Sequence, residues 1–156
     1  MAGSIIQVSI RKTHMTKQQQ SIGKHGQELA AATLRGLGVN MVEKIGTPVL
    51  LIPGSQKGQF KVIYEEPVSG DHRGILNDGT SVLAETKTIL DRNLRWSDLR
   101  EHQPGRLDEH HKHNGLSLLV WVHSEGVFVI EWPIFDFKPG GSITPAEAKF
   151  LHITQL

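Results

Sequence analysis

The order of apolar and polar residues predicts a chain that mixes helices with strands. Between residues 21 and 37, leucines recur at the spacing of one helix face, and glycines at 36 and 38 provide a stop. Short runs that are apolar or that alternate predict strands instead. These expected strands cover 47–52, 60–66, 116–123 and 127–132. The last two are almost continuously apolar, which predicts burial on both faces of a sheet.

A hairpin is the most informative element that this pattern predicts. It runs from Gly70 to Lys87, with Asn77-Asp78-Gly79 as a strong tight-turn signal. Strand side chains alternate between faces, so Glu85 and Lys87 project the same way on the return strand. Asp71 is expected to lie across the hairpin from them.

Two carboxylates and a lysine on paired strands suit a divalent-cation site with a fixed positive charge beside it. The alternative is a solvated face carrying weak ion pairs, which is common for exposed charges. However, residues 82–89 carry apolar side chains on both faces. This pattern is typical of an internal strand, where unpaired charges are costly and therefore more often functional.

A second helix is predicted from Ser97, as the N-cap, to about His113. Pro104 lacks a backbone N–H, so we expect the helix to kink or restart there. Gln103 shares a stripe with leucines and should face the sheet. A buried glutamine needs partners, and these could be a water or phosphate at a site, or backbone groups of the core.

The remaining segments add a loop and a short last helix. The loop at 91–96 carries Arg92 and Arg95 as expected phosphate contacts, and Trp96 is expected to anchor it in the core. Towards the end of the chain, Thr144 is the expected N-cap of a helix with Pro145 at its first position.

Composition restricts the class of protein more than its chemistry. A chain of 156 residues with 38% hydrophobic and 21% charged residues fits one domain with a real core. It has no cysteine, so disulfides and thiolate sites are excluded, which fits a reducing cytoplasm. No apolar run approaches about 20 residues, so we expect no membrane span and a cytoplasmic protein.

The distribution of charge matters more than the net charge of +1. The first 27 residues contain no acid but four basic side chains, which suit contacts with phosphate: Arg11, Lys12, Lys17 and Lys24. We therefore predict a flexible basic arm over 1–20 and a single domain over 21–156. The alternative for the arm is a solvated tail without a partner.

Several short motifs occur in the order found in one enzyme family. Asp71 with Glu85-Thr86-Lys87 resembles the signature of the PD-(D/E)XK nucleases, with Gly70 in place of the proline. The wider pattern, over about residues 23–132, resembles the RecU-type Holliday junction resolvases. Its further segments are Lys44 to Pro48, Asp71 to Gly74, Ala84 to Thr88, His102-Gln103 and Asn114-Gly115.

This resemblance implies an α/β fold with a restriction-endonuclease-like mixed central sheet flanked by helices. It also implies a Mg²⁺-dependent endonuclease, with Mn²⁺ able to substitute, that resolves four-way DNA junctions as a homodimer. Such a small enzyme would suit a phage, acting in the host cytoplasm. The family inserts a protruding stalk before the first acid, whereas Pro53 to Gly58 is expected here to be a plain loop.

The resemblance further implies roles for individual residues. Asp71, Glu85 and the backbone carbonyl of Thr86 would bind Mg²⁺, and Lys87 would activate the attacking water. Glu28 would join the metal site from the first helix. The alternative role for Glu28 is to stabilise the helix, because its negative charge lies towards the positive N-terminal end. Gln103 would position the water or the scissile phosphate, and Arg73 would contact DNA beside the first acid.

Two other functions remain open at this point. One is a different PD-(D/E)XK deoxyribonuclease, either restriction-like or general. The other is a DNA-binding relic of the fold that has lost its chemistry. The complete set of Asp71, Glu85 and Lys87 argues against a relic.

Overall fold

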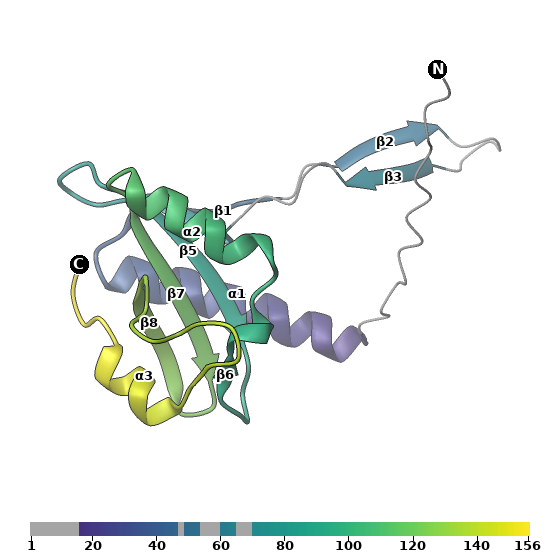
Figure 1. Ribbon diagram of the computed structural model, residues 1–156. Helices are drawn as coiled ribbons and strands as arrows, with labels where there is room; N and C mark the ends of the chain where they lie inside the picture. Colours follow the sequence, from purple (N-terminus) through teal and green to yellow (C-terminus); the bar gives the residue numbers. More distant parts are fainter. Residues whose placement is uncertain (1–15, 47–48, 54–59, 65–69) are drawn as a thin grey trace, which may run out of the picture.

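A five-stranded mixed sheet forms the centre of the molecule (Figure 1). The computed structural model describes residues 16–46, 49–53, 60–64 and 70–156. The sheet has the order β1-β4-β5-β7-β8, in which only β5 and β7 are parallel. Its strands are β1 Asn40–Lys44, β4 His72–Ile75, β5 Ser81–Thr88, β7 Leu116–His123 and β8 Gly126–Trp132.

Helices cover both faces of this sheet, which confirms the predicted α/β class. Helix α1, Lys17–Gly36, packs on one face through Ala30 and Leu34. The other face carries three elements around a core that contains Trp121 and Leu107. They are α2 His102–Lys112, the small ribbon of β6 Leu94–Arg95 with β9 Ser142–Ile143, and α3 Pro145–Leu151.

The near-continuous apolar run of β7 is explained by these two layers. Leu118 and Val120 face the α1 side, whereas Leu119 and Trp121 face the α2 side. All four side chains are fully buried. The predicted burial of this strand on both faces is therefore confirmed, and β5 pairs alongside it as an internal strand.

A separate two-stranded ribbon lies between β1 and β4 in the sequence. It consists of β2 Val49–Pro53 and β3 Phe60–Tyr64, which pair antiparallel with each other. Figure 1 shows this ribbon projecting away from the central sheet. The expectation of a plain loop is wrong at Pro53, which ends β2; residues 54–59 lie outside the described part of the chain.

The first helix begins four residues earlier than predicted. Thr16 accepts a hydrogen bond from the backbone N–H of Gln19, whose side chain accepts one from the Thr16 N–H. This capping box satisfies N–H groups that a helix start leaves unpaired. Residues 17–20 are therefore helical and not part of a flexible arm, and residues 1–15, with Arg11 and Lys12, lie outside the described residues.

The second helix begins later than predicted. A single 3-10 turn, Trp96–Asp98, precedes it, and α2 starts at His102 and not after Ser97. Pro104 is consequently the third residue of the helix, where its missing N–H removes no helical hydrogen bond, so no kink is needed. Helix α3 follows its prediction, with Thr144 capping the N–H of Glu147. No described helix has the length and apolar character needed to cross a bilayer.

Candidate active site

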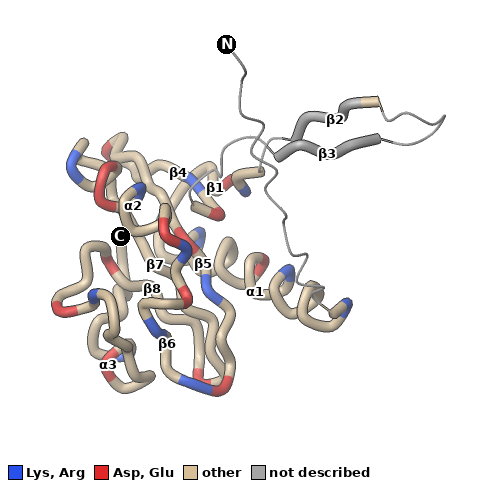
Figure 2. Tube along the Cα trace, turned by 45° about the vertical axis from the view of Figure 1, so that its right-hand side comes forward, with Lys and Arg blue, Asp and Glu red and all other residues tan. Residues whose placement is uncertain are grey.

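A cleft of about 740 Å³ opens between α1, the β4–β5 hairpin and the start of α2. The predicted residues Asp71, Glu85, Thr86, Lys87 and Gln103 all line it. Figure 2 shows basic positions along α1 and charged positions of both signs on β5. The hairpin thus supplies the acids while the two helices close the cleft from either side.

Asp71 is positioned by the way the chain enters the hairpin. Gly70 precedes it with a φ of 83°, a left-handed conformation that glycine adopts without strain. The Asp71 N–H then donates to the carbonyl of Ala84 at 2.8 Å. Because His72 pairs with Ala84, the preceding residue Asp71 lies near Glu85 where this pairing ends, and both residues line the cleft.

The carboxylate of Asp71 is held at both oxygens. Pairing with β4 ends at His72, so the N–H of Thr86 on β5 has no strand partner and donates to Asp71 Oδ2 at 2.8 Å. The Gln27 side chain, from α1, donates to Asp71 Oδ1 at 3.2 Å. The first acid is therefore fixed by one strand and one helix.

The second acid belongs to a compact group with a lysine and a glutamine. Glu85 is 2% exposed, and its Oε1 lies 3.1 Å from Lys87 Nζ. Gln103 donates to the same Glu85 oxygen. Its own Oε1 accepts from Lys87 Nζ at 2.8 Å and from the backbone N–H of Arg100 at 2.8 Å. Gln103 is buried, as predicted, and its partners are the site residues together with one backbone group.

The electrostatics of the cleft favour a cation. Burial raises the pKa of Glu85 above its ordinary value, and the nearby charge of Asp71 raises it further. Lys87 and Arg100 oppose this shift without cancelling it. Two carboxylates that repel each other in a partly buried cleft gain stability when a positive ion lies between them.

The donor atoms of the cleft fit Mg²⁺. The carboxylates of Asp71 and Glu85 supply oxygen ligands, which this ion prefers. In a strand, the N–H and C=O of one residue point to the same side, so the Thr86 carbonyl is directed to the edge where Asp71 lies. No group of three or more Asp, Glu, His or Cys side chains placed to hold a metal ion occurs in the described ranges. The remaining positions around an ion would be filled by water, as is usual for Mg²⁺.

Glu28 does not lie with these residues. It lines a neighbouring cleft instead, and its carboxylate lies 3.9 Å from His25 Nδ1 on the same helix. Its side chain is 64% exposed. The preceding residue, Gln27, occupies the place expected for Glu28 and contacts Asp71. The structure therefore does not bring Glu28 to the cleft that Asp71 and Glu85 line.

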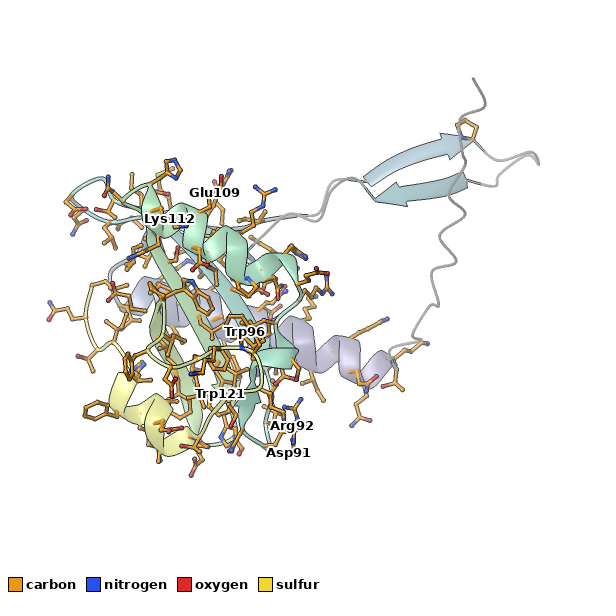
Figure 3. All side chains as sticks on the ribbon, in the orientation of Figure 1. Asp91, Arg92, Trp96, Glu109, Lys112 and Trp121 are labelled. Atoms are coloured by element: carbon orange, nitrogen blue, oxygen red, sulfur yellow. The ribbon has the colours of Figure 1, made fainter. Side chains whose placement is uncertain are left out.

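The residues predicted to contact DNA differ in their surroundings. Lys24 lines the cleft, and Lys17 is exposed in the first turn of α1. Arg73 is paired with Glu43 at 3.0 Å. Arg92 is also paired, through two hydrogen bonds to Asp98, and Figure 3 shows it beside Asp91 in the loop at one end of the sheet.

Arg95 is exposed, and its own backbone N–H donates to Asp98. Arg73, Arg92 and Arg95 do not line the cleft. The next residue, Trp96, packs partly buried against Trp132 and Phe137, as predicted for a core anchor. This loop is thus tied to the core. Among the predicted DNA contacts within the described residues, Lys24 is the one that lines the cleft.

Two residues that contact the predicted site residues were missed from the sequence. Gln27 and Arg100 contact the predicted residues directly. Gly26 is buried where α1 crosses β5, and a Cβ there would collide with the Thr88 side chain. The glycines before Glu28 indicate that this helix packs closely. The rotation of the helix about its axis, which decides the residues that face the sheet, could not be predicted from the sequence alone.

Comparison with known proteins adds no family: the chain matches no protein-family model, and a search of curated proteins finds no match. What the chain does is therefore inferred from the geometry of the cleft and from the motifs that compose it.

Proposed function

We propose that this chain is a Mg²⁺-dependent endonuclease with a restriction-endonuclease-like fold, acting on four-way DNA junctions. The observation that carries the proposal is the meeting of Asp71, Glu85 and Lys87 in one cleft, across a single β-hairpin. The order of motifs that resembles the RecU-type resolvases supports the same function. A plain ion-paired surface is a poor alternative, because Glu85 is almost completely buried.

The cation and the protein have separate tasks in the proposed reaction. Bound by Asp71, Glu85 and the Thr86 carbonyl, Mg²⁺ would supply charge stabilisation at the phosphate and a more acidic water. Mn²⁺, which accepts the same oxygen ligands, should replace it. Gln27 and the Thr86 N–H keep Asp71 in place for this task.

Lys87 provides the fixed positive charge of the site. Its Nζ is held by Glu85 and by Gln103, and only 14% of the side chain is exposed. A preorganised ammonium in such a place stabilises the negative charge that develops on the phosphate, and it orients the attacking water. Gln103 uses its oxygen for Lys87 and Arg100 and its nitrogen for Glu85. We therefore assign it to positioning Lys87 and Glu85, and no longer to the water or phosphate itself.

The β2–β3 ribbon supports a branched substrate over a plain duplex. It leaves the domain after Gly46 and returns at Gly70, and both Ile45 and Gly70 line the cleft. A projection rooted at the mouth of the site can reach into the opening of a junction while the cleft holds a strand. The resemblance also implies a homodimer making two symmetric cuts. Analytical ultracentrifugation of the purified chain tests this prediction.

A cleavage assay tests the proposed function. With Mg²⁺, the wild-type chain should cut a four-way junction much faster than a linear duplex made from the same arm sequences. Asp71→Asn should reduce the rate at least about a hundredfold, because removing preorganised charge stabilisation commonly costs this much, while junction binding remains. Equal cutting of both substrates would indicate a general nuclease. Wild-type rates for the Asp71→Asn variant would show that the assigned site is wrong.

A further inference from the structure

A second cleft, of about 310 Å³, lies beside the candidate active site. Its walls come from α1, β1 and β4. Lys24, Gln27 and Lys44 line both clefts, so the two share a wall. Gln27 contacts Asp71 directly, and the second cleft therefore begins one side chain away from the first acid.

The second cleft is strongly basic. Lys24, Arg35 and Lys44 line it, against Glu28 as its acidic residue. Within the described part of the chain, none of these three cations has a carboxylate within 4.0 Å. Unpaired positive charges in a concave site attract anions, and the surrounding protein focuses their field.

Most of the hydrogen-bond donors of Arg35 are available to a ligand. Arg35 donates one hydrogen bond to the Val42 carbonyl at 3.3 Å. Most of its guanidinium N–H groups therefore remain free to bind an anion. His72, which also lines the cleft, is 3% exposed, and its Nδ1 has no hydrogen-bond partner among the described residues. This imidazole is buried behind the cleft, so Lys24, Arg35 and Lys44 are the groups that would hold an anion.

We propose that this second cleft binds a phosphodiester group of the same DNA strand, near the one that is cut. The inference rests on the proposed function and names a further part of its substrate site. Arg35 and Lys44 hold the phosphate, and Lys24, on the shared wall, lies between the two positions. Neither Arg35 nor Lys44 was predicted to contact DNA, because a residue late in a helix and one at a strand end show no shared pattern in the sequence.

Binding measured without cleavage tests this inference. The parent is the Asp71→Asn variant, so that the junction stays intact. Adding Arg35→Gln should weaken junction binding about five- to tenfold, as loss of a charge-assisted hydrogen bond does. It should also reduce the slope of log K against log salt by about 0.9, the contribution of one phosphate contact.

Three further variants serve as controls. Arg35→Lys keeps the charge and should keep the salt slope. Lys44→Gln changes an exposed side chain and should repeat the loss without a risk to folding. Lys149→Gln removes an equally exposed positive charge on α3, outside both clefts, and should change neither affinity nor slope.

The possible outcomes distinguish a failure of this inference from a failure of the proposed endonuclease function. If Arg35→Gln and Lys44→Gln bind junctions with the parent's affinity and slope, the second cleft is not a DNA site, even when the wild type cleaves. If inorganic phosphate binds in an Arg35-dependent way while DNA affinity stays constant, the cleft takes free anions and the inference is equally wrong. If the variants reduce the salt slope but the wild type cleaves no DNA, the second cleft is still a DNA site, and only the proposed hydrolytic function is wrong.

Discussion

Gly26 controls how closely the first helix approaches strand β5. The residue is buried against β5, and a Cβ would collide with Thr88. Gln27, the next residue, contacts Asp71 and needs this close approach. A small residue at one position thus connects the packing of a helix with the orientation of an acid.

We predict that Gly26→Ala lowers both stability and cleavage. Relieving the collision should cost about 1–3 kcal/mol in the free energy of unfolding. A displacement of about 1 Å at the site can reduce a rate about a hundredfold. Urea unfolding and junction cleavage measure the two effects.

A control and a rescue make this prediction specific. Gly36→Ala lies on the same helix, where an added Cβ meets nothing within 4 Å, and should have little effect on cleavage. Combining Gly26→Ala with Thr88→Ala should restore part of both losses, since the two side chains are in contact. A Gly26→Ala variant that is as stable and active as the wild type would contradict this role.

The raised pKa of Glu85 predicts a dependence of stability on pH. A carboxyl whose pKa is higher in the folded state stabilises the fold fully below its unfolded pKa, near 4.3, and loses this contribution as pH rises through the raised value. Without divalent cations, the wild type should therefore lose stability relative to Glu85→Gln between pH values of about 5 and 8.

Urea unfolding in EDTA at both pH values measures this difference between the two chains. Adding Mg²⁺ at the higher pH should restore the stability of the wild type but not that of Glu85→Gln, since a ligand that binds only the folded state stabilises it. If the difference in free energy of unfolding between the wild type and Glu85→Gln does not change with pH, the surroundings of Glu85 do not destabilise its ionised form.

At the residue scale, local patterns predicted the two acids and the lysine but not the residues that hold them in place. Asp71, Glu85 and Lys87 belong to one hairpin: strand alternation places Glu85 and Lys87 on one face, and the tight turn brings Asp71 back near them. Gln27 comes from a helix, and which helical residue meets the sheet depends on helix rotation and packing. Gln27 and Glu28 are adjacent in the helix, and no local signal in this chain shows which of the two faces Asp71.

At the scale of elements, strands with an apolar or alternating pattern were predicted, including the short β2 and β3, whereas β1 was not. Strand β7 matches its prediction because its apolar run suits burial on both faces. Strand β1 was missed: Val42 is its only buried residue, so no apolar pattern marks it. The start of α2 was misplaced because Ser97 resembles a cap, whereas the chain first forms a 3-10 turn and then places Pro104 where it is tolerated.

The β2–β3 ribbon yields a prediction of its own. Its strands pair only with each other among the described strands, so replacing residues 47–69 by a short Gly-Ser linker should leave the central sheet folded. This deletion should abolish the preference for a junction over a duplex while residual duplex cleavage continues. Circular dichroism checks the fold, and competition between the two substrates measures the preference.

A comparison of the ribbon deletion with Asp71→Asn separates recognition from chemistry. The deletion should change which DNA is cut, whereas Asp71→Asn should stop cutting of every substrate. If the shortened chain kept the junction preference of the wild type, the ribbon would have no part in selecting the substrate.

At the scale of the whole molecule, the fold brings three distant parts of the sequence to one cleft. Helix α1 supplies Gln27 and Lys24, the hairpin supplies both acids and Lys87, and the start of α2 supplies Gln103. The sequence predicted the α/β class and most of this meeting, because the sheet order follows from a hairpin and a parallel crossover. The projection of the ribbon and the second cleft depend on tertiary placement, which no local pattern encodes.

Mn²⁺ added to the isotopically labelled chain tests the central claim most directly, since the paramagnetic ion broadens the amide signals closest to it. We predict that the signals of Asp71, Thr86 and Lys87 broaden first, at the lowest Mn²⁺ concentration, and that Mg²⁺ in excess reverses the effect. Asp71→Asn should remove this pattern. Broadening centred on another part of the molecule, or unchanged in the Asp71→Asn variant, would contradict the assignment of these acids to a cation.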